Sequence, residues 1–466
     1  MSFERLGTAL LFLSIAVAAC FSPAQNDTWW HLRAGEDIWT HHAVDLRDHY
    51  SHTADGAYWP NHEWLSQTLI FAGYRLGGLP LLTALVAALV VGAWWVVWQL
   101  TPGAGVLRLA LFAFATIPSS IAWSLRPQVL TLFMIALTGL VLVRRWHLLL
   151  PPLFLIWANL HAGVMLGFAV LGGALLAAAV DERRWPVRLG VIVGCCVAAT
   201  MLTPLGPSLW TEVPATLART RPYGIMEWQA PGLLEPLFAP FWFLAAALVT
   251  SILAVRPWRE PQTHAGTMIG AALAMLPLAL SSGRNVPPFM LLAVPAIAVL
   301  WSSRAPADRR TPTRREHPLL NTAILGFFGV VGVATVGYTW ISQSPRLGWH
   351  PLPPQAITAL EACPEPLYNR YDEGGYLIWF LPKRKVFLDS RQDPYPSTLV
   401  QAQIQAEASG NYEELFDQYA IRCAFVATDT PIARRLAADG WNETYKGPAW
   451  SVLTRDAFRR VTHKDD

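Results

Sequence analysis

Charged residues are scarce in this 466-residue chain, where Asp, Glu, Lys and Arg make up 14% of the sequence. Soluble domains usually carry about 25%, and 53% of this chain is hydrophobic, so an ordinary soluble enzyme is excluded. Disorder is excluded as well, because disordered chains have low hydrophobicity. The formal net charge of +3 lacks the basic excess of nucleic-acid-binding proteins, and we expect no nucleic-acid partner.

Several signatures of soluble enzymes are missing too. The sequence has no Walker loop, no Ser-His-Asp elbow and no Cys-based zinc pattern, and Gly374-Gly375 lacks the spacing of a dinucleotide fingerprint. Cysteine is rare, with five residues in total. Cys363 and Cys423 lie near the C-terminus, where an oxidising compartment would allow them to pair. Their spacing alone leaves that pairing open.

Long apolar runs dominate the chain instead. A run of about 20 apolar residues crosses a bilayer as a helix, and such runs lie near 5–22, 79–99, 106–123, 127–143, 147–161, 163–180, 187–203, 238–255, 264–281, 286–301 and 319–341. The first run also has features of a signal peptide, because Arg5 precedes it and small residues end it. Ten further runs favour a retained helix. The sequence therefore predicts an α-helical polytopic membrane protein with about 11 transmembrane helices.

The acidic residues gather at the C-terminus. Residues 342–466 hold 16 of the 32 acidic residues and all four lysines. We therefore predict a transmembrane domain over 1–341 and a small soluble α/β domain over 342–466. In that domain we expect strands at 366–369, 385–389 and 423–427, helices over 397–420 and 430–439, and a hairpin over 441–455. The stretch 371–381 is expected to open with a glycine turn and to begin a further helix.

Arginine placement predicts the orientation. Arginines follow alternate spans at 144–145, 183–184, 256–259 and 304–315, and basic loops face the cytoplasm. The segment 148–180 would be about 50 Å long as one helix at ~1.5 Å per residue, which is too long for one span, and basic residues flank both of its ends. It therefore needs a hairpin near 159–163. Loop 23–78, loop 204–237 and the C-terminal domain would face the periplasm of a bacterium, with the spans in the inner membrane.

The first outer loop, 23–78, is rich in polar and aromatic residues. Asp27 directly follows the first span, at the depth where a lipid-linked substrate presents its head group. Carboxylates suit general-base work or divalent metals, so Asp27, Asp48 and Glu63 are candidate catalytic residues. Asp27 and Glu63 are also candidate ligands of Mg²⁺ or Mn²⁺. Trp30, His31 and His62 are candidate substrate contacts. A plain aromatic interface loop is the alternative.

Polar residues at the ends of other spans are predicted to face the same side. Charges at membrane depth are costly and usually serve a site. The candidate substrate-binding residues here are Arg126, Asn159, His161, Glu227, Trp228, Arg284 and Asn285. The two arginines suit a phosphate or pyrophosphate. Snorkelling anchors or ion pairs between helices are the alternatives.

These stretches together resemble the GT-C class of membrane glycosyltransferases. The resemblance rests on 27–35, 48–51, 62–65, 126–128, 157–161, 227–228, 371–379 and 387–391. It extends over nearly the whole chain for a set of bacterial membrane proteins of this type, and is architectural for oligosaccharyltransferase catalytic subunits and protein O-mannosyltransferases. It implies a polyprenyl-phosphate-linked sugar donor and an acidic catalytic residue in the first outer loop. Asp27 stands alone there, without the paired acids of several such families.

We therefore expect an inverting glycosyltransferase at the periplasmic membrane face, with Asp27 as general base or metal ligand and an acceptor that the sequence does not identify. Two other functions stay open on the residues alone. One is a lipid-linked sugar flippase or transporter, which predicts charges near the bilayer midplane. The other is a non-catalytic membrane assembly protein.

Overall fold

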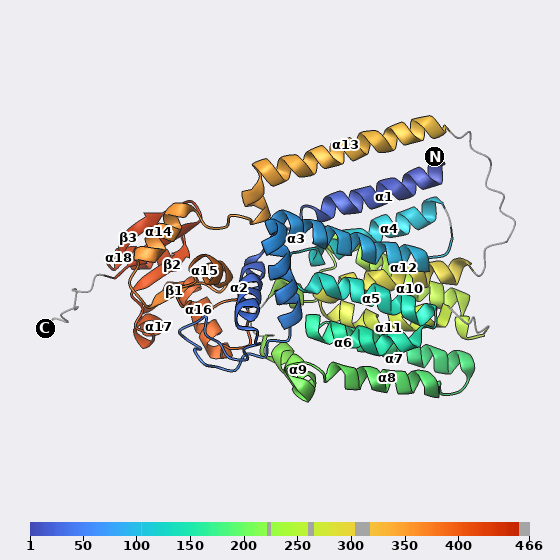
Figure 1. The fold of residues 1–466 in the computed structure, drawn as a ribbon, viewed down its shortest axis with the longest axis horizontal. Helices are drawn as coiled ribbons and strands as arrows, with labels where there is room; N and C mark the ends of the chain where they lie inside the picture. The colour runs from blue at the N-terminus through green and yellow to red at the C-terminus, as the bar shows by residue number, and fades with distance from the viewer. Residues whose placement is uncertain (104, 221–224, 260–264, 303–316, 456–466) are drawn as a thin grey trace. The chain divides into compact units, whose positions relative to one another are not determined.

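The computed structural model describes residues 1–103, 105–220, 225–259, 265–302 and 317–455 (Figure 1). The basic run 304–315, which the orientation argument uses, lies outside the described residues. The chain forms two compact units, each built from three segments. The helical unit comprises Met1–Pro23, His62–Val213 and Gly224–Leu347, and the mixed unit comprises Ala24–Asn61, Pro214–Tyr223 and Gly348–Asp466.

The helical unit is a bundle of apolar helices. Five helices in the described part of the chain are long and apolar enough to cross a membrane. Three of them are α3 (Trp64–Leu100), α7 (Val164–Glu182) and α13 (Pro318–Ser342). The other two are α10 (Ala239–Val255) and α12 (Val286–Ser302), each counted together with the short 3₁₀ turn that precedes it. Shorter apolar helices accompany them: α4 (Val106–Ser119), α5 (Gln128–Val143), α6 (Leu150–Leu160), α8 (Val187–Thr200) and α11 (Ala265–Ser281). α1 (Phe3–Ala19) lies beside α13 (Figure 1). The chain is thus a mostly helical, multi-pass membrane protein.

Two breaks in this bundle fall where the sequence predicted them. Within α3 the backbone leaves helical geometry at Gly77 and Gly78, and Gly78 takes a φ of 63° that a side chain would disfavour. Residues 63–75 have apolar residues at helical spacing, are too polar to span and are closely followed by Gly77-Gly78, which predicts an amphipathic interfacial helix. The break separates this helix from the span 79–99. The expected hairpin lies between α6 and α7, where His161 is extended and Gly163 begins the next helix.

Helices α7 and α11 approach each other through glycine. A Cβ atom on Gly173 would lie 2.2 Å from the carbonyl oxygen of Gly270, and a Cβ on Gly270 would lie 2.2 Å from the carbonyl oxygen of Gly173. Small residues let helix backbones pack closely in membranes, where packing replaces the hydrophobic driving force. Neither position has room for a larger residue.

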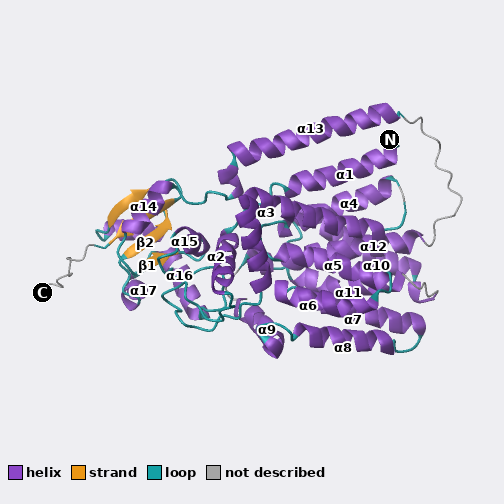
Figure 2. Ribbon diagram, in the orientation of Figure 1, coloured by secondary structure: helices purple, strands orange, loops and turns teal. Residues whose placement is uncertain are grey.

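The mixed unit is built on a four-stranded sheet, drawn in orange in Figure 2. The strands are β1 (Leu367–Asn369), β2 (Cys423–Ala427), β3 (Asn442–Lys446) and β4 (Trp450–Thr454), in the order β1-β2-β4-β3. β1 and β2 are parallel, whereas β4 is antiparallel to both β2 and β3. This confirms the expected small C-terminal mixed sheet, including the terminal hairpin.

Three details of this region differ from the prediction. Residues 385–389 form no strand, because only Val386 makes a bridge, to Ser51. The helix expected over 397–420 is two helices, α16 (Ser397–Ser409) and α17 (Glu413–Gln418), since Gly410 takes a φ of 80° and ends the first. The first outer loop contains a helix, α2 (Asn26–His41), that the sequence did not reveal.

Helices cover both faces of the sheet. Tyr368, Val426 and Leu453 pack on one side in a core with residues of α16, α17 and α18 (Pro431–Ala438). Leu367, Phe425 and Val452 point to the other side, where the core includes residues of α2, α14 (Pro354–Ala362) and α15 (Gly374–Phe380). Helix α2 therefore belongs to the same compact unit as the C-terminal residues. The division of the chain at residue 341 stays a prediction.

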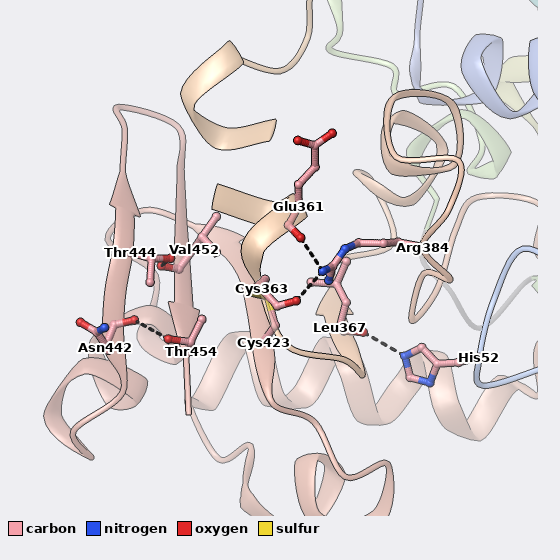
Figure 3. Close-up of a disulfide and its surroundings, with 10 residues drawn as sticks. All are labelled: His52, Glu361, Cys363, Leu367, Arg384, Cys423, Asn442, Thr444, Val452 and Thr454. Carbon is pink, nitrogen blue, oxygen red and sulfur yellow. Dashed lines mark hydrogen bonds between the residues drawn. A yellow bond between two sulfur atoms is a disulfide. The ribbon is translucent and has the colours of Figure 1, made fainter. Parts of the chain in front are cut away.

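A disulfide joins Cys363, at the end of α14, to Cys423, at the start of β2 (Figure 3). The Arg384 guanidinium beside it donates to the carbonyl oxygens of Glu361 and Cys363, and a ring nitrogen of His52 lies 2.9 Å from the Leu367 oxygen. Sixty residues separate the two cysteines. Closing a loop of that length stabilises the folded state by about 4 kcal/mol in the chain-entropy model.

Candidate functional site

Asp27 lies in the first turn of α2. The helix begins there because the Thr28 hydroxyl accepts a hydrogen bond from the backbone N–H of Gln25, at 3.0 Å. A carboxylate in a first turn is also stabilised by the helix dipole. Trp30 Nε1 donates to Asp27 Oδ1 at 3.3 Å, and the Ser390 hydroxyl donates to the same oxygen. Two donors thus fix the orientation of the Asp27 carboxylate.

Ser390 is held by the neighbouring residue of α2. Asn26 Nδ2 donates to Ser390 Oγ at 2.9 Å and to the Tyr371 carbonyl oxygen at 3.2 Å. A Cβ on Gly375 would lie 2.2 Å from the Asn26 carbonyl oxygen, and one on Gly374 would lie 2.0 Å from that of Leu388. The glycine pair therefore lets α15 approach both the Asp27 turn and the Ser390 segment.

Glu373, just before this glycine pair, is buried. Burial raises the pKa of its carboxyl to about 7, against the opposing effect of the Arg370 guanidinium. Trp450 Nε1 donates to its Oε1 at 3.3 Å. The protonated and ionised forms of Glu373 therefore coexist near neutral pH.

Asp48 is fully buried against Arg391. Arg391 Nη2 lies 2.6 Å from Asp48 Oδ1 and 2.6 Å from Asp389 Oδ2. The guanidinium also lies 4.8 Å from the ring centres of both Tyr50 and Trp59. Asp48 is thus enclosed by protein partners, which is the environment of a structural ion pair.

Trp30 and His31, the candidate substrate contacts in α2, lie side by side. The ring centres of Trp30 and His31 are 3.6 Å apart, and both residues are buried, at 6% and 2% exposure. Trp30 Nε1 also donates to Ser390 Oγ, at 3.2 Å. Trp30 therefore orients Asp27 directly, whereas His31 contributes to the packing behind it.

In the helical unit, Glu63 lies against His161. His161 Nε2 is 3.3 Å from Glu63 Oε1, and His62 Nε2 is 3.8 Å from the same oxygen. The backbone N–H of Gly163 donates to His161 Nδ1 at 2.9 Å. Because that nitrogen accepts, the ring proton of neutral His161 lies on Nε2 and points to Glu63.

Thr131, which was not among the candidates chosen from the sequence, fixes this geometry together with Gly163. Thr131 Oγ1 lies 2.8 Å from His161 Nδ1 and accepts from Trp157 Nε1 at 3.1 Å. A Cβ on Gly163 would lie 2.2 Å from Thr131 Oγ1. Thr131 is a buried hydroxyl inside an apolar run, and that is the signal that could have drawn attention to it.

Asn159 and Asn285 stabilise helix ends. Asn159 Oδ1 accepts from Trp64 Nε1 at 2.8 Å, and its Nδ2 donates to the carbonyl oxygens of Leu155 and Leu202. Asn285 Nδ2 donates to the Leu278 carbonyl oxygen at 3.1 Å. Both amides therefore hold backbone oxygens near the ends of helices.

Glu227 bridges the two candidate phosphate ligands. Arg126 Nη2 lies 3.1 Å from Glu227 Oε2, and Arg284 Nη1 lies 3.4 Å from Glu227 Oε1. The Arg284 guanidinium also lies 5.0 Å from the ring centre of Trp228. Three segments far apart in the sequence thus form one cluster with a net charge of +1, which suits an anion.

No group of three or more His, Cys, Asp or Glu residues that could hold a metal ion occurs in the described parts of the chain. The binding of Mg²⁺ or Mn²⁺ by Asp27 and Glu63 stays a prediction, since Mg²⁺ is usually held by one or two carboxylates together with substrate phosphates.

No protein-family model matches the sequence, and no curated protein matches it significantly. Solved structures do match. One is the oligosaccharyltransferase of Archaeoglobus fulgidus tethered to an acceptor peptide containing the NVT sequon, with a TM-score of 0.53 and 12% identity, over 90% of this chain and 69% of that chain. Another is the archaeal oligosaccharyltransferase AglB from A. fulgidus in complex with an inhibitory peptide and a dolichol-phosphate, with a TM-score of 0.47 and 11% identity, over 91% and 70%. The fold is therefore similar to that of an oligosaccharyltransferase, a GT-C membrane glycosyltransferase.

Proposed function

We propose that this chain transfers a sugar from a polyprenyl-phosphate-linked donor to an acceptor at the periplasmic face of the bacterial inner membrane. The eleven predicted spans would hold the lipid of the donor, and the first outer loop and the C-terminal domain would face the periplasm. The proposal draws on the oligosaccharyltransferase-like fold and on the chemistry of the described clusters.

The fixed carboxylate of Asp27 carries the proposal. It lies in the first turn of α2, the helix that follows α1 in the chain, and one of its oxygens accepts hydrogen bonds from Trp30 and Ser390. A carboxylate whose orientation is fixed in this way is prepared to act as a general base. A scaffold protein would need no such arrangement at the membrane surface.

In the proposed reaction Asp27 accepts the proton of the acceptor hydroxyl. The acceptor oxygen forms a bond to the anomeric carbon while the bond from that carbon to the phosphate oxygen breaks. The bonding electrons leave with the phosphate. A single displacement of this kind inverts the anomeric centre.

The arginine cluster would receive the leaving phosphate. Negative charge on the phosphate grows in the transition state, and fixed guanidinium groups stabilise it best when they are already in position. Glu227 holds Arg126 and Arg284 before the donor arrives. Its own charge leaves the cluster one positive charge, enough to attract a phosphate and to allow its release.

Glu63 would assist as a second carboxylate. Its Oε1 lies 3.3 Å from Nε2 of His161, within reach of the proton on that nitrogen. His161 would therefore position Glu63. Asp48 has no role in the proposed reaction, because Arg391 and Ser51 enclose it.

The test is transfer of radiolabelled sugar from a panel of undecaprenyl-phosphate donors in membranes that express the full chain. Wild type, Asp27→Asn and Asp45→Asn would be compared, each with and without added Mg²⁺ or Mn²⁺. Asp45 is the matched control, since its carboxylate lies in the same loop and is 59% exposed. We expect Asp27→Asn to lose ~10²- to 10⁴-fold in rate, the usual contribution of a general base, and Asp45→Asn to keep its activity.

Retained turnover in Asp27→Asn would remove Asp27 from the mechanism. Absence of transfer by wild type from every donor, in membranes that contain the folded protein and candidate acceptors, would favour the transporter or the assembly protein. Loss of activity on chelation, restored by Mn²⁺ or Mg²⁺, would show a cation requirement that the described donor set does not explain.

A further inference from the structure

A cavity that is open on one side, with a volume of about 580 Å³, lies in the helical unit beside the first turns of α1. Nine residues from three helices line it: Glu4, Arg5, Thr8, Ala9 and Phe12 of α1, Val91, Trp95 and Trp98 of α3, and Arg108 of α4. An open depression of this kind suits part of a lipid molecule rather than an enclosed small molecule. None of these residues belongs to the clusters described above.

The cavity has an apolar wall made of aromatic rings. Phe12 meets Trp95 and Trp98 edge to face, with ring centres 5.3 and 5.8 Å apart. The Trp95 side chain is half exposed, at 50%. In a membrane protein an exposed tryptophan at a helix end lies at the level of the lipid head groups. This wall is therefore suited to an acyl chain.

Three charged groups also line the cavity, and two of them are already engaged. The Arg108 guanidinium lies 3.6 Å from the ring centre of Trp98 and donates to the carbonyl oxygens of Trp98 and Gly103. Glu4 Oε1 accepts from the backbone N–H of Gly105 at 3.1 Å. Arg108 thus caps the end of α3, and Glu4 the beginning of α4.

The Arg5 side chain differs from these two. It makes no hydrogen bond or ion pair with the described residues. Arg108 Nε is also buried without a hydrogen-bond partner in that part of the chain. With one carboxylate and two guanidinium groups, the cavity carries a net charge of +1. A zwitterionic lipid also brings a phosphate, but its cationic group would lie beside two guanidinium groups, and the single carboxylate, Glu4, already accepts a backbone hydrogen bond.

We propose that this cavity binds an anionic phospholipid. The phosphate would accept hydrogen bonds from Arg5 and lie beside Arg108, because guanidinium groups match phosphate oxygens. One acyl chain would cover Phe12 and Trp95. A soluble anion fits less well, since it would leave the aromatic wall uncovered. This site is independent of the proposed sugar transfer, and its residues would bind lipid whether or not the chain is an enzyme.

The experiment is native mass spectrometry of the full chain purified in detergent, titrated with dioleoyl phosphatidylglycerol or with dioleoyl phosphatidylcholine. The variants are Arg5→Gln, Trp95→Ala and, as a control, Arg144→Gln. Arg144 follows α5 and is exposed, so the control removes one positive charge elsewhere on the bundle. Arg5 is preferred to Arg108 because Arg108 also caps α3.

We expect wild type and Arg144→Gln to retain one phosphatidylglycerol molecule more tightly than phosphatidylcholine. Arg5→Gln should weaken phosphatidylglycerol binding about 10-fold, the effect of one charged hydrogen bond. It should also narrow the preference for phosphatidylglycerol over phosphatidylcholine, because phosphatidylcholine loses the same phosphate contact but is relieved of repulsion between its choline and Arg5. Trp95→Ala should weaken both lipids. Equal retention of the two lipids by wild type would overturn the proposal, and so would an Arg5→Gln variant that binds phosphatidylglycerol as wild type does.

Discussion

Replacing Asp48 with alanine should destabilise the mixed unit while its neighbour Asp45 tolerates the same change. Asp48 has no exposed side-chain surface, and Arg391 Nη2 lies 2.6 Å from its Oδ1. Asp48 also accepts from the hydroxyl and backbone N–H of Ser51. The backbone N–H of Tyr50 donates to Asp48 as well. The substitution therefore removes one partner of a buried cation and leaves three local donors unpaired.

The size of the destabilisation depends on the hydrogen bonds that Arg391 retains after Asp48 is removed. Breaking a buried ion pair by removing one partner costs about 3–5 kcal/mol. Arg391 retains two hydrogen bonds to Asp389, at 2.8 and 2.6 Å, so the lower end, about 3 kcal/mol, is expected for Asp48→Ala. In a unit of about 150–250 residues, 1 kcal/mol shifts the melting temperature by about 2–4 °C, which gives a fall of about 6–12 °C. Arg391→Leu should be worse, because it leaves two buried carboxylates without their shared cation.

The assay is thermal unfolding of the full-length protein in detergent, followed by tryptophan fluorescence. Asp45→Ala is the control, since an exposed carboxylate usually changes stability by less than about 0.5 kcal/mol. The reasoning would be refuted if Asp48→Ala melted with wild type. If that variant were also inactive in sugar transfer, Asp48 would be a catalytic residue after all.

Two further predictions concern stability. Since burial raises the pKa of Glu373 from its usual value to about 7, the fold favours the protonated acid, so the free energy of unfolding should fall as pH rises from about 4.5 to 7. Glu373→Gln should remove this pH dependence, and its free energy of unfolding should exceed that of wild type by about 3 kcal/mol at pH 8. Thermal unfolding of both proteins from pH 4 to 8 measures this. Identical pH profiles for the two proteins would contradict a buried, protonated Glu373. Gly173→Leu should prevent α7 from packing against α11 and lower the yield of monodisperse protein in size-exclusion chromatography, whereas Gly172→Leu, with nothing within 4 Å of its Cβ, should behave as wild type. Normal behaviour of both glycine variants would contradict the close backbone contact.

The parts of the fold that the sequence predicted depend on local pattern. The break at Gly77-Gly78, the turn at 161–163 and strand β2 each follow from residues within a few positions of one another. Helix α2 was missed because its mean hydropathy is low and its aromatic residues suit an interface loop equally well. The predicted helix over 397–420 is longer than α16 because a single glycine, Gly410, is a weaker sign of a helix end than a proline.

The candidate site shows the same limit more clearly. Asp27 could be singled out because it follows the first span directly. Its partner Ser390 is 363 residues away, and no periodicity connects positions so far apart. Asp48 looked like a second catalytic acid for the same reason, since Arg391 has no sequence signal that pairs it with one acid and not another. Position in the loop that follows the first span was enough to select Asp27 and Asp48 as candidates. Only the three-dimensional contacts distinguish Ser390, which orients Asp27, from Arg391, which forms a buried ion pair with Asp48.

The position of α2 within the mixed unit has a consequence for synthesis of the protein. The 363 residues between Asp27 and Ser390 take about 20–70 s to translate at ~5–20 residues per second. During that interval Trp30 and Ala34 lack the β-sheet core against which they finally pack. The nascent segment therefore remains without its packing partners until the last quarter of the chain has been synthesised. A chaperone or the membrane surface itself would have to shelter it, and a premature stop codon anywhere before the sheet would leave that segment permanently unfolded.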